Sequence, residues 1–440
     1  MRFTPWATRL ALTLSLSATA LLTACGGGGN DGDNNTQVRL LNATRSYAQL
    51  DLSVDDKAIN SKVAYASVGE YGSVKSDGPA VRVLTSDVGT SITATQPSLT
   101  GGSNYTFISY GFAGAVRMTT LQEAETAPEA NKAKLLVLNL APDAGALDIY
   151  VTTATDPLDT ATALSTNLAG GSGSGYIQIN SGTFRVRVTG YNKRTDLRLD
   201  IPAMTLDSAS VNTLILTASD GGVLVNGISL VQKGAVKNFP NTQSRVRTVA
   251  ALTNNATVGT TLNGQAMLTG AISPLISEYV TTASGASTLS AMVNGAPVTF
   301  AAPTLAAGGD YTLMVWGSAA APQLAVLSDD NRLPTVNGNV KVRLVNGLTG
   351  LTSSLNVDFS ALASNVGAGL ASTSASVSST ASSQVDVTVP TSSTPIYTNS
   401  ALALPANSVW TFFAVPNTAT VGTTTSPVPG MSALPKRERP

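Results

Sequence analysis

The chain has 440 residues and a formal net charge of zero, and only 12% of its residues are charged. Without a basic excess we expect no nucleic-acid partner. Histidine is absent and there is a single cysteine, which excludes Ser–His–Asp triads, Cys–His zinc sites and an intramolecular disulfide. Carboxylate pairs, Ser–Lys pairs and oxygen-only calcium sites remain open, but no motif indicates a metal or a cofactor, and we predict none.

The first residues have the pattern of an export signal. Arg2 and Arg9 precede an apolar run from Leu10 to Ala24. A transmembrane helix needs about 20 residues, so this run is shorter than a permanent span. It ends in Leu22-Thr23-Ala24-Cys25, which resembles the lipobox of bacterial lipoproteins.

That resemblance implies cleavage between Ala24 and Cys25 and acylation of Cys25, with palmitate among the expected chains. Gly26 follows the cysteine, which in the same family implies the outer membrane, on its periplasmic or extracellular face. Residues 25–37 then form a Gly/Asn/Asp tether. The alternative is a plain secretory signal, cut after Ala20 or Ala24, that leaves Cys25 as a free thiol.

Beyond residue 37 apolar and polar residues alternate, as in LDLSVDD (50–56). This period of two predicts strands with one buried face. Asn-Gly and Asp-Gly pairs, which favour tight hairpins, separate many of these segments. They are Asp77-Gly78, Asn226-Gly227, Asn263-Gly264, Asn294-Gly295 and Asn346-Gly347.

The strand motifs recur at a period of about 100 residues, which indicates whole domains in tandem. The opening strand VRLLN (38–42) returns as KLLVLN (134–139), RVRTVA (245–250) and KVRLVN (341–346). A late strand carries a threonine in every copy: Thr106, Thr213, Thr312 and Thr411. Each unit holds about seven short strands, which fits an immunoglobulin-like β-sandwich.

We therefore predict an all-β chain of four tandem immunoglobulin-like β-sandwiches after the signal peptide (1–24) and tether. The predicted boundaries are 38–123, 134–232, 245–331 and 341–422. Residues 423–440 are rich in Ser and Pro, and we expect them to form a disordered tail.

With these motifs, the repeated units resemble a bacterial family, the domain of unknown function 4397. The likeness rests on the opening V-R-L-L-N-A (38–43), the middle Leu-Asp strand and the late Tyr-Thr strand followed by glycine, as in Tyr105-Thr106 and Gly111. The third unit departs from it, with Ala250 in place of the asparagine. The resemblance implies a secreted or surface β-sandwich and no activity.

Tyr71, Tyr176 and Tyr279 occupy matching places in three units. They could form a row of surface aromatics that stack on sugars. The alternative, which we favour, is a structural plug at the sandwich edge, with the ring buried and the hydroxyl bonded.

Two further sets of charged residues are candidates. Arg185 and Arg187 belong to the strongest basic cluster and could touch anionic glycan or lipid head groups, although strand alternation more simply places both in water. Asp51 and Asp148 hold equivalent places in the first two units. A catalytic carboxylate pair must lie within about 10 Å, so we expect these two, in different domains, to be solvent-facing strand residues.

The sequence thus predicts a non-enzymatic outer-membrane or cell-surface lipoprotein whose tandem sandwiches bind, adhere or scaffold the envelope. Its expected partners are the membrane, through the N-terminal lipid, and an envelope glycan or protein. One alternative is a structural spacer without a ligand. The other is a carboxylate-based enzyme acting on envelope or extracellular glycans. The sequence defines neither the ligand nor the oligomeric state.

Overall fold

A computed structural model describes residues 34–417, 428 and 430–439. Within these residues the chain forms β-strands and one 3₁₀ helix, η1 (Pro142–Ala144), with no α-helix. The described part also contains no helix long and apolar enough to cross a membrane. The prediction of an all-β chain of β-sandwiches is confirmed.

Every sandwich consists of an inner sheet, which contains the opening strand, and an outer sheet. In the first sandwich the inner sheet has the order β4-β1-β8-β9, with β5 also on β1, and the outer sheet is β3-β2-β6-β7. The strands are β1 (Asn35–Asn42), β2 (Gln49–Val54), β3 (Lys57–Ala64), β4 (Ser67–Val68), β5 (Gly72–Lys75), β6 (Val81–Thr85), β7 (Ser91–Thr95), β8 (Asn104–Tyr110) and β9 (Arg117–Gln122).

In the second sandwich the inner sheet is β13-β10-β17-β18-β19, with β14 also on β10, and the outer sheet is β12-β11-β15-β16. The strands are β10 (Lys132–Leu140), β11 (Leu147–Thr152), β12 (Ser165–Leu168), β13 (Ser172–Gly173), β14 (Ile177–Asn180), β15 (Gly182–Gly190), β16 (Lys193–Leu206), β17 (Ser210–Ala218), β18 (Val225–Val231) and β19 (Val236–Phe239).

The third sandwich has the inner sheet β23-β20-β29-β30, with β24 also on β20, the outer sheet β22-β21-β26-β27 and the small sheet β25-β28. The strands are β20 (Gln243–Leu252), β21 (Thr257–Leu262), β22 (Gln265–Ile272), β23 (Leu275–Ile276), β24 (Val280–Ala283), β25 (Gly285–Ala286), β26 (Leu289–Val293), β27 (Ala296–Val298), β28 (Thr304–Leu305), β29 (Asp310–Ser318) and β30 (Ala321–Asp329).

The fourth sandwich has the inner sheet β34-β31-β37-β38 and the outer sheet β33-β32-β35-β36. The strands are β31 (Asn339–Asn346), β32 (Ser353–Val357), β33 (Ser360–Val366), β34 (Ala375–Ser378), β35 (Thr380–Thr388), β36 (Tyr397–Leu404), β37 (Ser408–Pro416) and β38 (Met431–Arg439).

The opening strand of each sandwich pairs in parallel with the late strand: β1 with β8, β10 with β17, β20 with β29 and β31 with β37. These opening strands are buried along most of their length. Strands covered on both faces have nearly continuous apolar sequences, which explains why VRLLN does not alternate.

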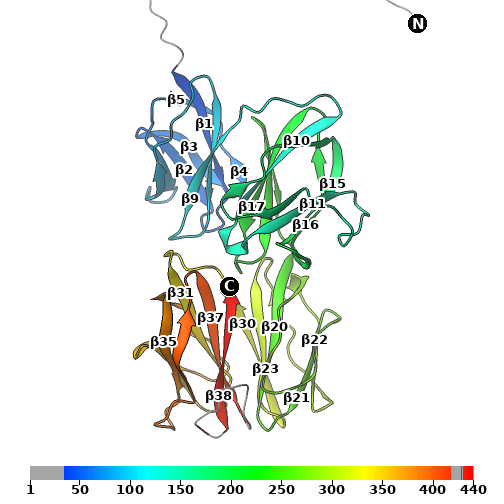
Figure 1. The fold of residues 1–440 in the computed structure, drawn as a ribbon, viewed down its shortest axis with the longest axis vertical. Helices are drawn as coiled ribbons and strands as arrows, with labels where there is room; N and C mark the ends of the chain where they lie inside the picture. The colour runs from blue at the N-terminus through cyan, green and yellow to red at the C-terminus, as the bar shows by residue number, and fades with distance from the viewer. Residues whose placement is uncertain (1–33, 418–427, 429, 440) are drawn as a thin grey trace, which may run out of the picture.

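The inner sheets face each other in pairs. One apolar cluster joins β1, β8 and β9 of the first sandwich to β10, β17 and β18 of the second. Another joins β20 and β29 of the third to β31 and β37 of the fourth. We call each such interface a seam. The first pair (sandwiches one and two) lies end to end on the second pair (sandwiches three and four), which gives a two-by-two array (Figure 1).

The asparagine of the opening strand fastens each sandwich at one end. Asn42 is fully buried, and its amide donates to the carbonyl oxygens of Val63 and Tyr47 while its oxygen accepts the N–H of Thr44. Asn139 and Asn346 make the equivalent bonds. In the third sandwich, where Ala250 replaces the asparagine, the Ser273 hydroxyl bonds both the N–H and the carbonyl of Leu252.

The predicted tight turns hold at two of the Asn-Gly pairs. Asn263-Gly264 and Asn294-Gly295 connect adjacent strands with positive φ at both residues. Asn226-Gly227 instead lies within β18. Asn346-Gly347 ends β31, and a Cβ built on Gly347 would lie 2.8 Å from the Cβ of Ala251, so glycine here permits close approach across the seam.

The last residues differ from the predicted disordered tail. Met431–Arg439 form β38, which pairs with β37 at the edge of the fourth inner sheet. The Ser/Pro-rich composition did not reveal that Ala433 and Leu434 would pack against apolar clusters. In Figure 1 β38 runs toward the centre of the array.

Candidate functional site

A buried arginine on the opening strand faces the late-strand threonine in three of the four sandwiches. The Nε atoms of Arg39, Arg247 and Arg343 donate to the hydroxyls of Thr106, Thr312 and Thr411 at 2.9, 2.9 and 3.1 Å. The parallel register aligns each arginine with its threonine. Leu136 takes this place in the second sandwich.

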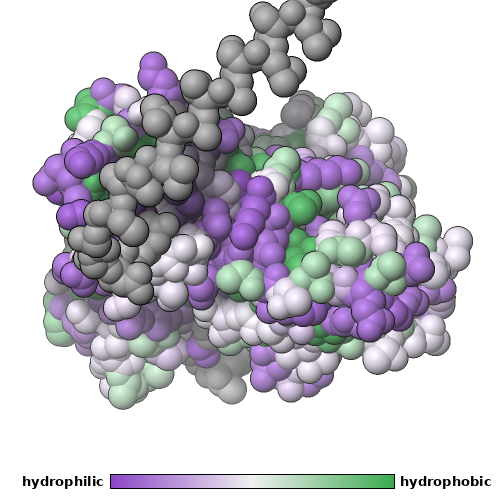
Figure 2. Space-filling view, turned by 90° about the horizontal axis from the view of Figure 1, so that it is seen from above, coloured by the Kyte–Doolittle hydropathy of each residue, from purple (hydrophilic) through white to green (hydrophobic). Residues whose placement is uncertain are grey.

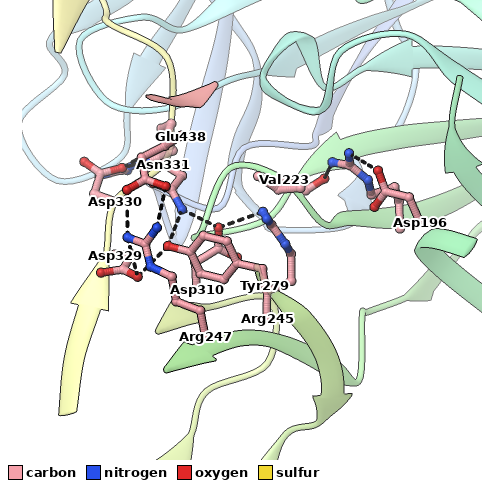
Figure 3. A network of polar contacts seen from close by, with 12 residues as sticks. Asp196, Val223, Arg245, Arg247, Tyr279, Asp310, Asp329, Asp330, Asn331 and Glu438 are labelled. Atoms are coloured by element: carbon pink, nitrogen blue, oxygen red, sulfur yellow. Dashed lines mark hydrogen bonds and ion pairs between the residues drawn. The ribbon is translucent and has the colours of Figure 1, made fainter. Parts of the chain in front are cut away.

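In the second pair these arginines reach across the seam. Arg247 of the third sandwich binds Glu438 of the fourth with two hydrogen bonds of 2.7 Å (Figure 3). Arg343 of the fourth sandwich binds Asp329 of the third. Each sandwich therefore contributes a carboxylate to its neighbour's arginine, as in an isologous interface.

The network continues beside the seam. The Tyr279 hydroxyl donates to Asp329 at 2.5 Å, and its ring lies 4.5 Å from the Arg247 guanidinium. Burial, together with the charge of Asp329, raises the pKa of Tyr279 well above 10. Burial opposes ionisation of Asp329 as well, but the positive charges of Arg343 and Arg247 hold its pKa below its ordinary value. We infer that this network holds the third and fourth sandwiches together.

The first pair has one such arginine. Arg39 binds Glu123 of its own sandwich at 3.0 Å and also donates to the carbonyl of Gly234 in the second. Glu123 in turn accepts the backbone N–H of Lys233 and the Tyr71 hydroxyl. The carboxylate is 1% exposed, and its bonds to Arg39 and to the Lys233 N–H join the two sandwiches at the seam.

The three predicted tyrosines thus lie beside the seams. The Tyr71 ring stacks on Arg39 at 4.3 Å, and Tyr279 is held by Asp329. Tyr176 packs against the apolar cluster between the first two sandwiches. These positions agree with our structural interpretation more closely than with a surface row.

Both arginines of the predicted basic cluster bind groups of the same chain. Arg185 pairs with Asp200 at 2.5 Å. Arg187 was expected in water, but it is only 4% exposed and donates to the Thr152 hydroxyl and the Asp156 carbonyl. The alternation rule failed here because the 152–156 loop covers the strand.

Asp148 also departs from its predicted place in solvent, since it is 3% exposed. Its carboxylate accepts the backbone N–H groups of Asn167 and Asn192, both at 2.9 Å. Asn167 has a φ of 53°, so Asp148 secures a left-handed residue at a strand irregularity. Asp51 accepts the N–H of Lys62, also left-handed, in the same way. Ala24 and Cys25 lie outside the described residues.

One cavity lies where the two pairs meet. This junction pocket has a volume of about 470 Å³, within the range of about 300–1,000 Å³ typical of small-molecule sites. The end of β8 and the β8–β9 turn form one wall, and η1, the 330–337 segment and the fourth sandwich form the others. The 330–337 segment is the connector between β30 of the third sandwich and β31 of the fourth.

A charged triad occupies one wall of the junction pocket. Asp330 accepts hydrogen bonds from Arg332 at 2.7 and 3.1 Å and pairs with Lys341 at 3.0 Å. Burial would raise the pKa of Asp330, but its bonds to Arg332 and the charges of Arg332 and Lys341 lower it to about 2. The Arg332 guanidinium also lies 4.7 Å from the Phe112 ring centre.

Three further polar side chains line the junction pocket: Tyr110, Arg117 and Asp143. Tyr110 and Arg117 are cross-strand neighbours on β8 and β9, and Arg117 is exposed. Asp143 on η1 accepts the Leu333 N–H at 2.6 Å. Burial raises the pKa of Asp143, against the lowering effect of that hydrogen bond. Within the described residues, no three His, Cys, Asp or Glu side chains gather as a metal would require.

The sequence did not indicate this pocket. Asp330, Arg332 and Lys341 lie at or beside the gap between the predicted third (245–331) and fourth (341–422) sandwiches. Only the density of charge there, in a chain with few charged residues, could have drawn attention to it. The pocket needs two pairs stacked end to end, and no local pattern encodes that packing.

The fold and the seams define a protein of paired tandem β-sandwiches. The chain belongs to the family described as the domain of unknown function DUF4397, whose profile matches residues 36–150 and 244–353. The two matched regions cover just over half of the 440 residues. Each begins in the opening strand of one sandwich and ends in the second strand of its partner, β11 in the first pair and β32 in the second.

No curated protein matches the sequence. Among solved structures, the chain is similar to CBMbc, a family 26 carbohydrate-binding module from Eubacterium rectale Amy13K, solved in complex with maltoheptaose. The identity is 12%, and the match covers 46% of this chain and 97% of that one, with a TM-score of 0.17. A TM-score this low defines no ligand for this chain.

Proposed function

We propose that this chain is a non-catalytic binding protein, tethered to the outer membrane through Cys25, whose stacked sandwiches present the junction pocket to a ligand. The observation that carries the proposal is the pocket itself, because residues of the first, second and fourth sandwiches and of the connector after the third line it together. Ligand sites occur preferentially at interfaces between domains. A plain spacer has no need of such a cavity.

The direction of the first strand supports the tether. Asn35 begins β1 at the end of the array far from the junction, and β1 runs toward the second pair (Figure 1). A tether before Asn35 would hold the first pair nearest the membrane and the second pair outward. On the visible part of that near end, hydrophilic and neutral residues predominate, and hydrophobic ones form small separate areas (Figure 2). Attachment would therefore depend on the lipid.

A carboxylate-based hydrolase is the second candidate, because Asp143 and Asp330 line the same pocket and their pKa values are displaced in opposite directions. Such a displacement is typical of acid–base pairs. We favour binding because both oxygens of Asp330 are already occupied by Arg332 and Lys341. Release of sugar products by the protein, lost in Asp143→Asn, would support the hydrolase instead.

A screen of the mature protein against envelope glycans and envelope proteins tests the proposal. Ser374 lines the pocket and is exposed, so Ser374→Trp should fill the cavity without disturbing a core. We expect a retained partner that Ser374→Trp no longer binds. Ser98→Trp, at a separate surface hollow, is the matched control and should bind normally. If no partner is retained, the spacer interpretation holds. A partner that Ser374→Trp retains equally would bind outside the junction pocket and would overturn the proposal.

A further inference from the structure

We propose that the junction pocket takes a short acidic saccharide, a sugar chain that carries carboxylate or sulfate groups. This inference rests on the proposed function and gives its ligand a chemical class. It follows from the balance of charge in the pocket and from the neutral groups around that charge.

Positive charge exceeds negative charge in the pocket lining. Three cations, Arg117, Arg332 and Lys341, face two carboxylates, Asp143 and Asp330. Arg332 and Lys341 share Asp330. Among the described residues no carboxylate forms an ion pair with Arg117, which is also exposed. An incoming anionic group would therefore gain a charge-assisted bond to Arg117 without breaking an existing ion pair.

The rest of the lining fits hydroxyl groups. Ser374, Thr335 and Asn337 line the pocket and are exposed to solvent, and they can donate and accept hydrogen bonds. Asp143 uses one oxygen for the Leu333 N–H, which leaves acceptor capacity for a sugar hydroxyl. A fully ionised inorganic anion could accept hydrogen bonds from these donors, but it has no hydroxyl to donate to Asp143.

The pocket also has an apolar floor. Tyr110 and Phe112 are 7% and 9% exposed, and both line the cavity. Sugar rings present apolar C–H faces beside their hydroxyls, and aromatic side chains supply matching apolar area with a polar edge. The volume of about 470 Å³ suits a short oligosaccharide.

Calorimetric titration of the mature protein tests the inference with three probes of equal length: a galacturonic acid trimer, a sulfated galactose trimer and the neutral galactose trimer. We expect an acidic trimer to bind at least about tenfold more tightly than the neutral one, the size of one hydrogen bond to a charged group. Comparing carboxylated with sulfated trimers identifies the anionic group, and free sulfate should bind far more weakly than either.

Arg117→Gln should remove the preference for acidic over neutral trimers, and Ser374→Trp should abolish binding of all. Arg82→Gln is the matched control, because it removes one charge from an exposed ion pair with Asp56 in the same sandwich, and it should bind like the original. Equal binding of neutral and acidic trimers, blocked by Ser374→Trp, would overturn the acidic class and leave the binding function intact. Binding of none of the probes would overturn this inference, and the envelope screen above would then decide the proposed function separately.

Discussion

The guanidinium of Arg247 binds the carboxylate of Glu438 through two hydrogen bonds of 2.7 Å, although 191 positions separate the residues in the chain. The arginine is wholly buried and the glutamate is 1% exposed. Together with the pair of Arg343 and Asp329, this bond ties the third and fourth sandwiches reciprocally. The consequences of this arrangement can be measured.

Replacing Arg247 should destabilise the second pair strongly. Arg247→Met leaves Glu438 buried without its cation, and breaking a buried ion pair costs about 3–5 kcal/mol. We expect the free energy of unfolding, measured by denaturant titration of that transition, to fall by this amount. Arg82→Met breaks only an exposed pair and should cost no more than about 1 kcal/mol. Equal losses in the two variants would refute a structural role for the seam network.

Removing the final strand should loosen the same seam. A chain that stops before Met431 lacks Glu438 and leaves β37 as an open edge. Unpaired edges exchange amide hydrogens faster and promote association. We expect faster hydrogen exchange in β37, and aggregation during purification. Lys436→Gln, which loses only a pair with the exposed Glu278, should behave normally. Unchanged exchange in the shortened chain would show that β38 is dispensable.

The opening-strand asparagine should be a stability determinant. Asn42→Ala removes two donated bonds and one accepted bond from a fully buried site, and buried groups left without partners cost about 1–3 kcal/mol. Thermal unfolding of the first pair should show this loss. Asn399 accepts a nearby N–H in an exposed setting, so Asn399→Ala should cost much less. A neutral result for Asn42→Ala would contradict the fastening role.

Asp310 should give the second pair a recognisable pH dependence. Burial raises its pKa from 3.8 to about 6, although Arg245 and Asn331 act against the shift and the charge of Asp329 reinforces it. Between these values the folded state binds more protons than the unfolded state, so this residue's contribution to stability falls as pH rises from about 4 to 6.

In Asp310→Asn this contribution is absent. The difference in unfolding free energy between the variant and the original should therefore move in favour of the variant, on the order of 2–3 kcal/mol, between pH 4 and pH 7. Denaturant titrations at several pH values measure it. A difference that stays constant across this range would mean that the Asp310 pKa is not raised.

The anchor proposal depends on one sulfur atom. Cys25→Ala should abolish labelling of the protein by a palmitate analogue and release it from the membrane fraction, because a single peptide tether without acyl chains has no affinity for lipid. Gly26→Ala is the control and should remain both labelled and membrane-bound. Membrane retention of an unlabelled Cys25→Ala protein would disprove the lipid anchor.

The strands and repeats could be predicted from local sequence pattern, because the alternation of apolar and polar residues along a strand reflects which of its faces is buried. The recurring opening strand and the late threonines indicated the β-sandwich class and the family, and both were confirmed. The same pattern misplaced Arg187 and Asp148. Burial of these residues depends on a loop and on left-handed residues elsewhere in the chain, and alternation along one strand contains no information about them.

By itself the sequence determined the all-β class, the repeat and the family, since these follow from short-range hydrophobic periodicity and backbone preferences. Only the tertiary structure decided that sandwiches join through their inner sheets, that residues 431–439 complete the fourth sandwich, and that a pocket lies between the pairs. Those features depend on contacts between residues such as Arg247 and Glu438, far apart in the chain, whose partners are fixed only when whole domains pack.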